Sequence, residues 1–215
     1  MITDSNIQSG MWGTHLPNDG SKIGGNMPAK YGVVQPVPSS TAALVFIEGG
    51  AYSDFEAYVT RPALPNTGLL TLNYTLTTDR NAPVMAQAIE TDTILTVNGW
   101  TYNLSAQLNY EEGGHFQVAN ESGTWIDSGC VPGKLSPDVP HKISIQYHFS
   151  QISRTSSVLS VTVDDSVYPL PLSLGNIPAR QRGWSDGAIF QLQLDLGASG
   201  GAYSVLIDEA SYVWQ

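Results

Sequence analysis

The chain has 215 residues, of which 41% are hydrophobic and only 13% are charged, so it is too apolar for a disordered chain and long enough for one sizeable core. Its 9 Lys and Arg residues stand against 19 Asp and Glu residues, for a formal net charge of −10. Binding to nucleic acid or to an anionic membrane surface requires a cluster of basic residues, and so few cations exclude one. An acidic polysaccharide is also disfavoured as a ligand, unless Arg180 and Arg182 converge with the few lysines.

The first 40 residues are rich in Gly and Pro. We expect them to form an irregular segment draped over a single domain that spans residues 1–215. The N-terminus has no basic stretch followed by an apolar one, so we expect no signal peptide within this sequence. We also expect no membrane insertion, because no stretch is long and apolar enough. The lone cysteine, Cys130, cannot form an internal disulfide. We interpret the chain as the mature or excised part of an extracellular or periplasmic protein.

Helical periodicity is almost absent from the rest of the chain, and strand-like alternation takes its place. Asn98-Gly99 between two alternating runs predicts a two-residue hairpin, and Asp164-Asp165 predicts another more weakly. The predicted strands are Ala42–Glu48, Tyr52–Thr60, Gly68–Leu76, Val84–Val97, Thr101–Tyr110, His115–Ala119, Thr124–Asp127, Lys142–Phe149, Val158–Val163, Val167–Leu170, Ile189–Leu196 and Tyr203–Val213. Many short strands at close spacing indicate an all-β fold, a sandwich of two antiparallel sheets.

Successive side chains of a strand point to opposite faces, so each strand divides into a core side and an outer side. In Ile189–Leu196, for example, Phe190, Leu192 and Leu194 alternate with polar residues. The polar side chains that we place on the outer face are Glu90, Asp92, Gln107, Asn109, His115, Gln117, Gln146, His148, Gln191, Gln193 and Asp195. Amides and carboxylates suit the paired donors and acceptors of sugar hydroxyls. The alternative is an outer sheet face that is merely polar.

Tryptophans near turns add an apolar component to this surface. Trp100, Trp125 and Trp184 lie at predicted strand ends or in loops, where an indole ring can stack on a sugar ring. For each of them the competing interpretation is a plug at one end of the core. Trp214, in the last strand, is expected in the core.

Two carboxylates, Glu90 and Asp92, lie on one face of a predicted strand, about 6.5–7 Å apart along it. Retaining glycosidases place two carboxyl groups about 5–5.5 Å apart. The segment Ala-Ile-Glu-Thr-Asp resembles the catalytic strand of the concanavalin-like lectin and glucanase superfamily, Glu-x-Asp-x-(x)-Glu. The resemblance implies that Glu90 is a nucleophile and Asp92 its assisting aspartate. The third acid is missing, because Ile94 and Leu95 stand in its place.

Further segments resemble the same superfamily, which includes laminarinases and laminin-G-like modules. They are Trp-Ile-Asp-Ser-Gly, His-Lys-Ile-Ser-Ile-Gln-Tyr, Leu-Ser-Val-Thr-Val-Asp-Asp and the final Ile-Asp strand, within residues 86–214. The resemblance implies a concanavalin-like jelly roll. It also implies a possible structural Ca²⁺ at Asp208 with Glu48 as partner, although calcium takes about 6–8 oxygen ligands. No cofactor is otherwise required.

The leading hypothesis is a lectin-like domain that binds a neutral polysaccharide through this polar face and its edge tryptophans. The first alternative is a polysaccharide-cleaving enzyme, either a glycoside hydrolase using Glu90 and Asp92 or, less favoured, a lyase in which His115 and His148 meet beside Tyr102, Tyr110 or Tyr147. The second alternative is a structural or adhesive module that binds protein.

Overall fold

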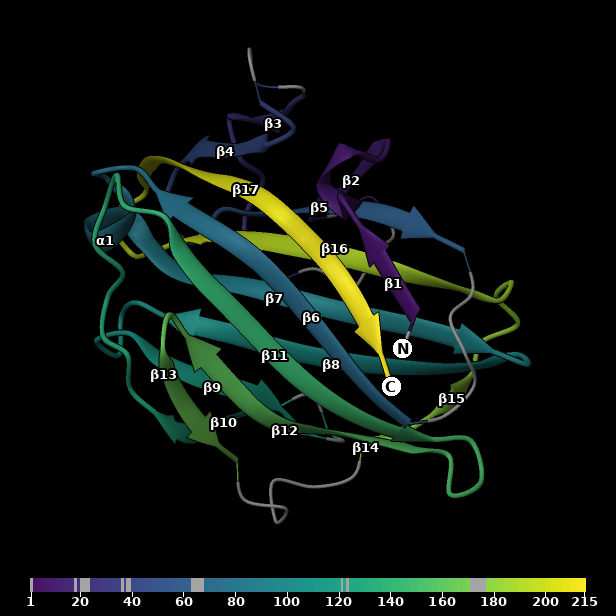
Figure 1. Cartoon of the computed structure of the whole chain (residues 1–215). Coiled ribbons are helices and arrows are strands. Elements are labelled where there is room, and N and C mark those ends of the chain that lie inside the picture. Colours follow the sequence, from purple (N-terminus) through teal and green to yellow (C-terminus); the bar gives the residue numbers. More distant parts are fainter. Residues whose placement is uncertain are drawn as a thin grey trace.

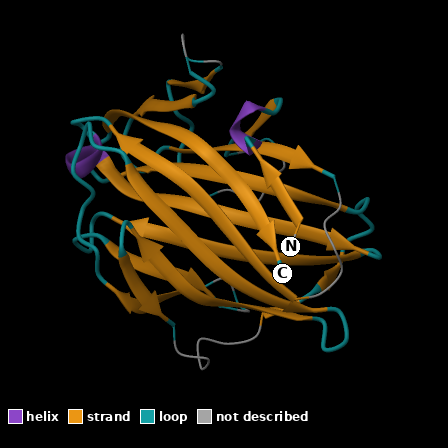
Figure 2. Ribbon diagram, in the orientation of Figure 1, coloured by secondary structure: helices purple, strands orange, loops and turns teal. Residues whose placement is uncertain are grey.

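A computed structural model describes residues 2–17, 19, 24–35, 37, 40–62, 68–120, 122, 124–170 and 177–215. The two helices in this part of the chain are short, η1 (Ile7–Ser9) and α1 (Ala82–Met85), and strands make up nearly all the other regular structure (Figure 2). Neither helix has the length and apolar character needed to cross a bilayer. The strands form two antiparallel sheets packed face to face, which confirms the predicted all-β sandwich.

Sheet A contains nine of the described strands. In the order in which they lie side by side, seven of them are β13 (Ser166–Pro169), β12 (Thr155–Val163), β11 (His141–Ser150), β6 (Gly68–Thr78), β17 (Gly201–Trp214), β4 (Ala43–Gly49) and β3 (Lys30–Val34). The other two are β1 (Ile2–Ser5), which pairs with β17, and β14 (Ile177–Pro178), which pairs with β12. Figure 1 shows β17 near the middle of this sheet, with the two ends of the chain close together.

Sheet B contains eight of the described strands. Its order is β10 (Trp125–Cys130), β9 (His115–Ala119), β8 (Trp100–Asn109), β7 (Ala86–Val97), β16 (Gly187–Leu196), β5 (Asp54–Arg61) and β2 (Trp12–His15). The eighth strand, β15 (Arg180–Gln181), pairs with β8.

Two parts of the chain differ from the sequence-based expectation. Within the first 40 residues, expected to be irregular, β1, β2 and β3 extend the sheets; strands of four or five residues are too short to show an alternation of their own. The predicted strand Val84–Val97 begins later, at Ala86, because α1 precedes it. Asp79 Oδ1 accepts hydrogen bonds from the amides of Asn81 and Ala82, and Pro83 suits the first turn of a helix.

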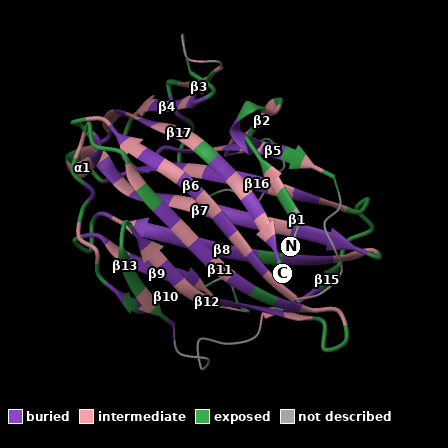
Figure 3. Ribbon diagram, viewed as in Figure 1, coloured by how far each residue is buried: buried purple, intermediate pink, exposed green. Residues whose placement is uncertain are grey.

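The core lies between the sheets and follows the predicted alternation. Buried and half-buried residues alternate along β6, β11 and β17 (Figure 3). Aromatic rings join the layers, since the ring centroids of Tyr74 and Phe190 lie 6.1 Å apart. Trp214 packs edge-on against Phe149, with 4.6 Å between the centroids, so its core location is confirmed.

Both predicted hairpins are present. Asn98 and Gly99 connect β7 to β8 with φ values of 52° and 75°, as a type I′ turn requires, and Asp164-Asp165 connects β12 to β13. The turn fixes Val97 opposite Trp100 and thereby sets the register of the two strands.

Replacing Gly99 by Ala tests this turn. The substituted protein is expected to lose about 1 kcal/mol of unfolding free energy, because a Cβ atom disfavours the left-handed conformation. An added Cβ would meet no atom within 4 Å, so the backbone alone is tested. The measurement is urea-induced unfolding, and the matched control is Gly50→Ala, which is equally open and has no positive φ. Equal effects of the two substitutions would contradict the assignment.

Candidate functional site

The face of sheet B that points away from the core carries a continuous row of polar side chains. Residues directly opposite one another on neighbouring strands point to the same side of a sheet. The row crosses seven strands, from β2 to β10, and consists of His15, Glu56, Gln193, Glu90, Gln107, Gln117 and Asp127.

A second row lies beside the first, two residues further along each strand. It consists of Tyr58, Gln191, Asp92 and Ser105. The imidazole of His15 stacks on the ring of Tyr58, with 4.7 Å between the centroids. A third row is partly apolar, with Ile189 opposite Ile94. The surface thus changes from acidic to apolar along the strands.

These rows form the floor of a cleft with a volume of about 1030 Å³, at the upper end of the range for small-molecule sites. At the β2 side the cleft is lined by His15 and Asp19, whose Nδ1 and Oδ2 atoms lie 3.5 Å apart. At the β8 side it is lined by Trp125 and by residues after the end of β14, including Arg182 and Trp184. The guanidinium of Arg182 lies 5.1 Å from the centre of the Trp184 ring.

Hydrogen bonds hold the amide side chains of the floor in fixed orientations. Gln191 Nε2 donates to Asp92 Oδ2 over 2.6 Å, and Gln193 Nε2 donates to Asp195 Oδ1 over 2.7 Å. Further along the row, Gln107 Nε2 donates to Gln117 Oε1 over 2.6 Å. Two of these three bonds end on carboxylates, those of Asp92 and Asp195, so the acids and amides of the floor hold one another in place.

Burial raises the pKa values of the carboxyl groups on this face. Burial raises the pKa of Glu56 to about 7, with the charges of Asp92, Asp19 and Asp195 adding to the effect. Burial also raises the pKa of Asp92 to about 6, although hydrogen bonds from neighbours such as Gln191 oppose the shift. The pKa of Glu90 lies well above its usual range, because of burial first and then the charges of Asp92 and Asp195.

Two further acids lie directly opposite each other beside the first row, Asp54 on β5 and Asp195 on β16. Burial raises the pKa of Asp54 to about 7, and burial with the charge of Asp54 raises the pKa of Asp195 to about 8. Among the described residues, no Lys, Arg or His forms an ion pair with either of these acids or with Glu56, Glu90 or Asp92. The raised pKa values of these acids accordingly come from burial first.

The structure brings together part of the predicted ligand set. The predicted residues that line the cleft are Glu90, Asp92, Trp125, Trp184, Gln191 and Gln193. Those that lie on sheet B beyond the lining are Gln107, Asn109, His115, Gln117 and Asp195. Trp100 is half-buried outside the cleft, under the guanidinium of Arg154 at 3.9 Å from its ring centre.

Gln146 and His148 do not belong to this site. Both lie on β11, which is in sheet A, so the expectation that they share one outer face with the other polar residues is corrected. The alternation within a strand does not reveal the sheet to which the strand belongs. For the same reason His148 cannot meet His115, and Tyr102, Tyr110 and Tyr147 are buried in the core.

Glu56, Tyr58 and His15 also line the cleft, although they were not predicted from the sequence. The signal for the first two was present, since Glu56 and Tyr58 alternate with the buried Phe55, Ala57 and Val59. For His15 there was none, because β2 is recognisable only by its pairing with β5.

The residues proposed for calcium do not fit that ion. Glu48 lies opposite Ala202, six positions along β17 from Asp208, so the two carboxylates are not brought together. Asp208 Oδ1 instead accepts hydrogen bonds from Gln8 Nε2 at 3.2 Å and Thr41 Oγ1 at 3.1 Å. No group of three or more His, Cys, Asp or Glu side chains in the described part of the chain is arranged to hold a metal ion.

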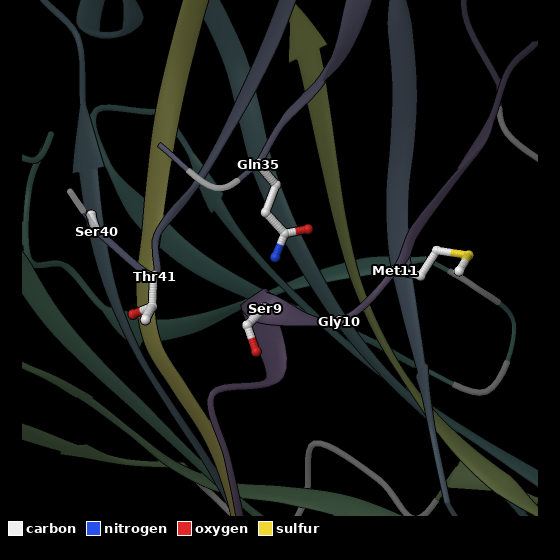
Figure 4. Close-up of a pocket in the computed structure, with 6 residues that line it drawn as sticks. All are labelled: Ser9, Gly10, Met11, Gln35, Ser40 and Thr41. Atoms are coloured by element: carbon white, nitrogen blue, oxygen red, sulfur yellow. The ribbon is translucent and has the colours of Figure 1, made fainter. Parts of the chain in front are cut away.

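A second, smaller hollow of about 500 Å³ lies beside η1 (Figure 4). Its lining, Ser9, Gly10, Met11, Gln35, Ser40 and Thr41, contains no titratable side chain. Gln35 donates to the backbone oxygen of Gln8 and so ties the neighbouring segments together. The hollow offers little chemistry compared with the cleft of sheet B.

The fold is similar to that of known carbohydrate recognition domains. The domain of Emp47p matches with a TM-score of 0.52 and 12% identity, over 94% of this chain and 87% of that one. A variant of the Emp46p domain matches with a TM-score of 0.53 and 10% identity, over 96% and 93%. No protein-family model matches the sequence, and no match is found among curated proteins. At such identities the similarity concerns the fold alone, a sandwich of two antiparallel sheets.

The acidic face makes a prediction about stability and pH. A carboxyl whose pKa is raised in the folded state holds a proton that the unfolded chain releases, so stability falls as pH rises from the unfolded pKa to the folded one. We expect the melting temperature to fall by more than about 5 °C between pH 4.5 and pH 8. Thermal denaturation followed by circular dichroism measures this decrease.

Glu56→Gln and Asp195→Asn should each flatten this pH dependence, because each removes a group that retains its proton in the folded state. Asp165→Asn, at an exposed carboxyl in the β12–β13 turn, is the matched control and should leave the slope as it is. A wild-type protein whose stability rises steadily over this interval would contradict the account.

Proposed function

We propose that this protein binds carbohydrate in the cleft of sheet B. The observation that carries the proposal is the combination, in one cleft, of an ordered polar floor and two tryptophans at its edge. Amide and carboxyl groups can accept and donate hydrogen bonds to sugar hydroxyls, and indole faces can pack on sugar rings. The similarity of the fold to carbohydrate recognition domains supports the proposal.

The ligand that we propose is a polysaccharide without acidic groups, as the net charge of −10 indicates. A cleft that crosses several strands and is open to solvent suits a segment of an extended chain better than a single small molecule. The proposed location is extracellular or periplasmic, where polysaccharides of this kind occur.

Binding to soluble neutral polysaccharides tests the proposal. In affinity gel electrophoresis with a β-glucan, a xylan and a galactomannan, at least one is expected to retard the wild-type protein. Trp125→Ala and Gln191→Ala are each expected to weaken binding about tenfold, since a central aromatic or polar contact is commonly worth more than 1 kcal/mol.

The matched control is His148→Ala, which removes an exposed side chain on sheet A and should leave binding unchanged. The proposal fails if no polysaccharide retards the protein, or if His148→Ala weakens binding as much as the cleft variants do.

Hydrolysis of the bound polysaccharide is a second candidate function, favoured by the position of Glu56. Glu56 and Glu90 flank Gln193 in the first row, two strand spacings or about 9.6 Å apart between Cα atoms. Inverting glycosidases hold their two carboxyl groups about 6.5–9.5 Å apart, with one as acid and the other as base. Glu56 would thus supply the partner acid that the sequence of β7 lacks.

If this second function holds, the wild-type protein should release reducing ends from the polysaccharide that it binds, and both Glu90→Gln and Glu56→Gln should reduce the rate at least about a hundredfold. Glu48→Gln, on sheet A, is the control and should retain the full rate. Release that survives Glu90→Gln removes Glu90 from the catalytic role. The absence of release from every bound polysaccharide leaves binding as the function.

A further inference from the structure

A single row of side chains across sheet B has an aromatic residue at each end. From β5 to β10 the row consists of Tyr58, Gln191, Asp92, Ser105, Ala119 and Trp125. The place of Ala119 in it follows from the register of β9 against β8, in which Val118 lies opposite Ala106. All six residues line the cleft, so the row runs along the floor from one side of the cleft to the other.

The middle of this row is more deeply buried than its ends. Gln191, Asp92 and Ser105 are 6%, 4% and 5% exposed, whereas Tyr58 and Trp125 are half-buried. The hydrogen bond from Gln191 to Asp92 holds part of the middle in place. The row therefore has a low polar centre between two more exposed aromatic rings.

A glycine on the edge strand makes room for the Tyr58 ring. Gly13 on β2 lies opposite Tyr58, and a Cβ atom added to Gly13 would lie 2.6 Å from the hydroxyl oxygen and 2.9 Å from Cε1 of that ring. The end of the ring thus occupies the space that a side chain at position 13 would fill. His15, also on β2, stacks its imidazole on the same ring, with 18° between the two planes. Tyr58 and His15 together form a two-ring surface at the β2 end of the cleft.

The opposite end of the row has rings of its own. Trp125 on β10 and Trp184 both line the cleft, and Trp184 is 44% exposed. In sheet B, β5 and β10 are separated by five strand-to-strand spacings of about 4.8 Å, so the two ends of the row lie about 24 Å apart. One sugar ring cannot contact both ends, whereas a chain of several linked rings can.

We propose that the cleft binds a polysaccharide chain that lies across the strands of sheet B along this row, with one sugar ring on Tyr58 and His15 and another beside Trp125. The apolar face of a sugar ring packs on each aromatic surface, and the hydroxyls of the sugars between them face the polar centre. This inference rests on the proposed function and adds to it the direction of the chain, an aromatic subsite at the β2 end and a minimum length of the ligand.

The minimum length follows from the joint action of the two ends. A chain that is bound at one end is held close to the other, so the second contact forms at a high effective concentration and raises the affinity by a factor of about 100 or more. A chain too short to reach both ends lacks this gain. The dependence of affinity on length is therefore the property that distinguishes this arrangement from a single aromatic subsite.

Calorimetric titration with two oligosaccharides of different length tests the inference. The probes are the trisaccharide and the hexasaccharide of the backbone of whichever polysaccharide, β-glucan, xylan or galactomannan, retards the protein in affinity gel electrophoresis. The wild-type protein is expected to bind the hexasaccharide at least about a hundredfold more tightly than the trisaccharide. Tyr58→Leu should weaken binding of the hexasaccharide about tenfold and that of the trisaccharide no more than about twofold, because the shorter chain can still occupy the tryptophan end.

Gly13→Ala and Tyr168→Leu complete the set of variants. Gly13→Ala should weaken binding of the hexasaccharide because its Cβ displaces the Tyr58 ring, and it should add little to the loss when combined with Tyr58→Leu. Tyr168→Leu is the matched control, since Tyr168 is a half-buried tyrosine on β13 in sheet A, and it should keep both affinities. Circular dichroism and melting curves establish that each variant is folded.

Equal affinities of the wild-type protein for the two oligosaccharides overturn the inference, as does an equal loss for both in Tyr58→Leu. If the hexasaccharide binds through Trp125 but neither Tyr58→Leu nor Gly13→Ala changes its affinity, the inference fails and the proposed function stands. The same conclusion follows if a polysaccharide binds and the hexasaccharide does not. If no carbohydrate binds at all, both fail.

Discussion

The pairing register of β16 is the constraint on which the site depends. β16 lies between β5 and β7 and sets Gln193 between Glu56 and Glu90, and Gln191 between Tyr58 and Asp92. A shift of one residue would turn these polar side chains into the core and expose Phe190, Leu192 and Leu194 in the cleft. The hydrophobic side of β16 therefore fixes the positions of the polar groups on its other side.

Much of this arrangement follows from the sequence. The alternation along β7, β8 and β16 correctly divided those strands into core and polar sides, and Asn98-Gly99 fixed the register of β7 against β8. Those signals are local, because a strand's own residues or a short turn carry them. Glu90, Asp92, Gln191 and Gln193 were accordingly predicted as neighbours on one face.

The remainder depends on contacts between distant parts of the chain. Nothing within His141–Ser150 indicates that β11 joins sheet A, and its alternation resembles that of the sheet B strands. Likewise β2 and β15 are short segments that form strands only by pairing with the longer strands β5 and β8. Most of the cleft floor could thus be predicted from the sequence, whereas the edges of the cleft could not.

The position of β17 bears on how the protein is made. This last strand lies between β4 and β6 in sheet A and also pairs with β1, which comes from the opposite end of the chain. Strands β4 and β6 are joined in one sheet only once β17 has been synthesised and has paired with both of them. These pairings have large sequence separations, so sheet A forms slowly. Meanwhile the edges of β4 and β6 would stay open to pairing with other chains, so assistance from a chaperone would matter most during this interval.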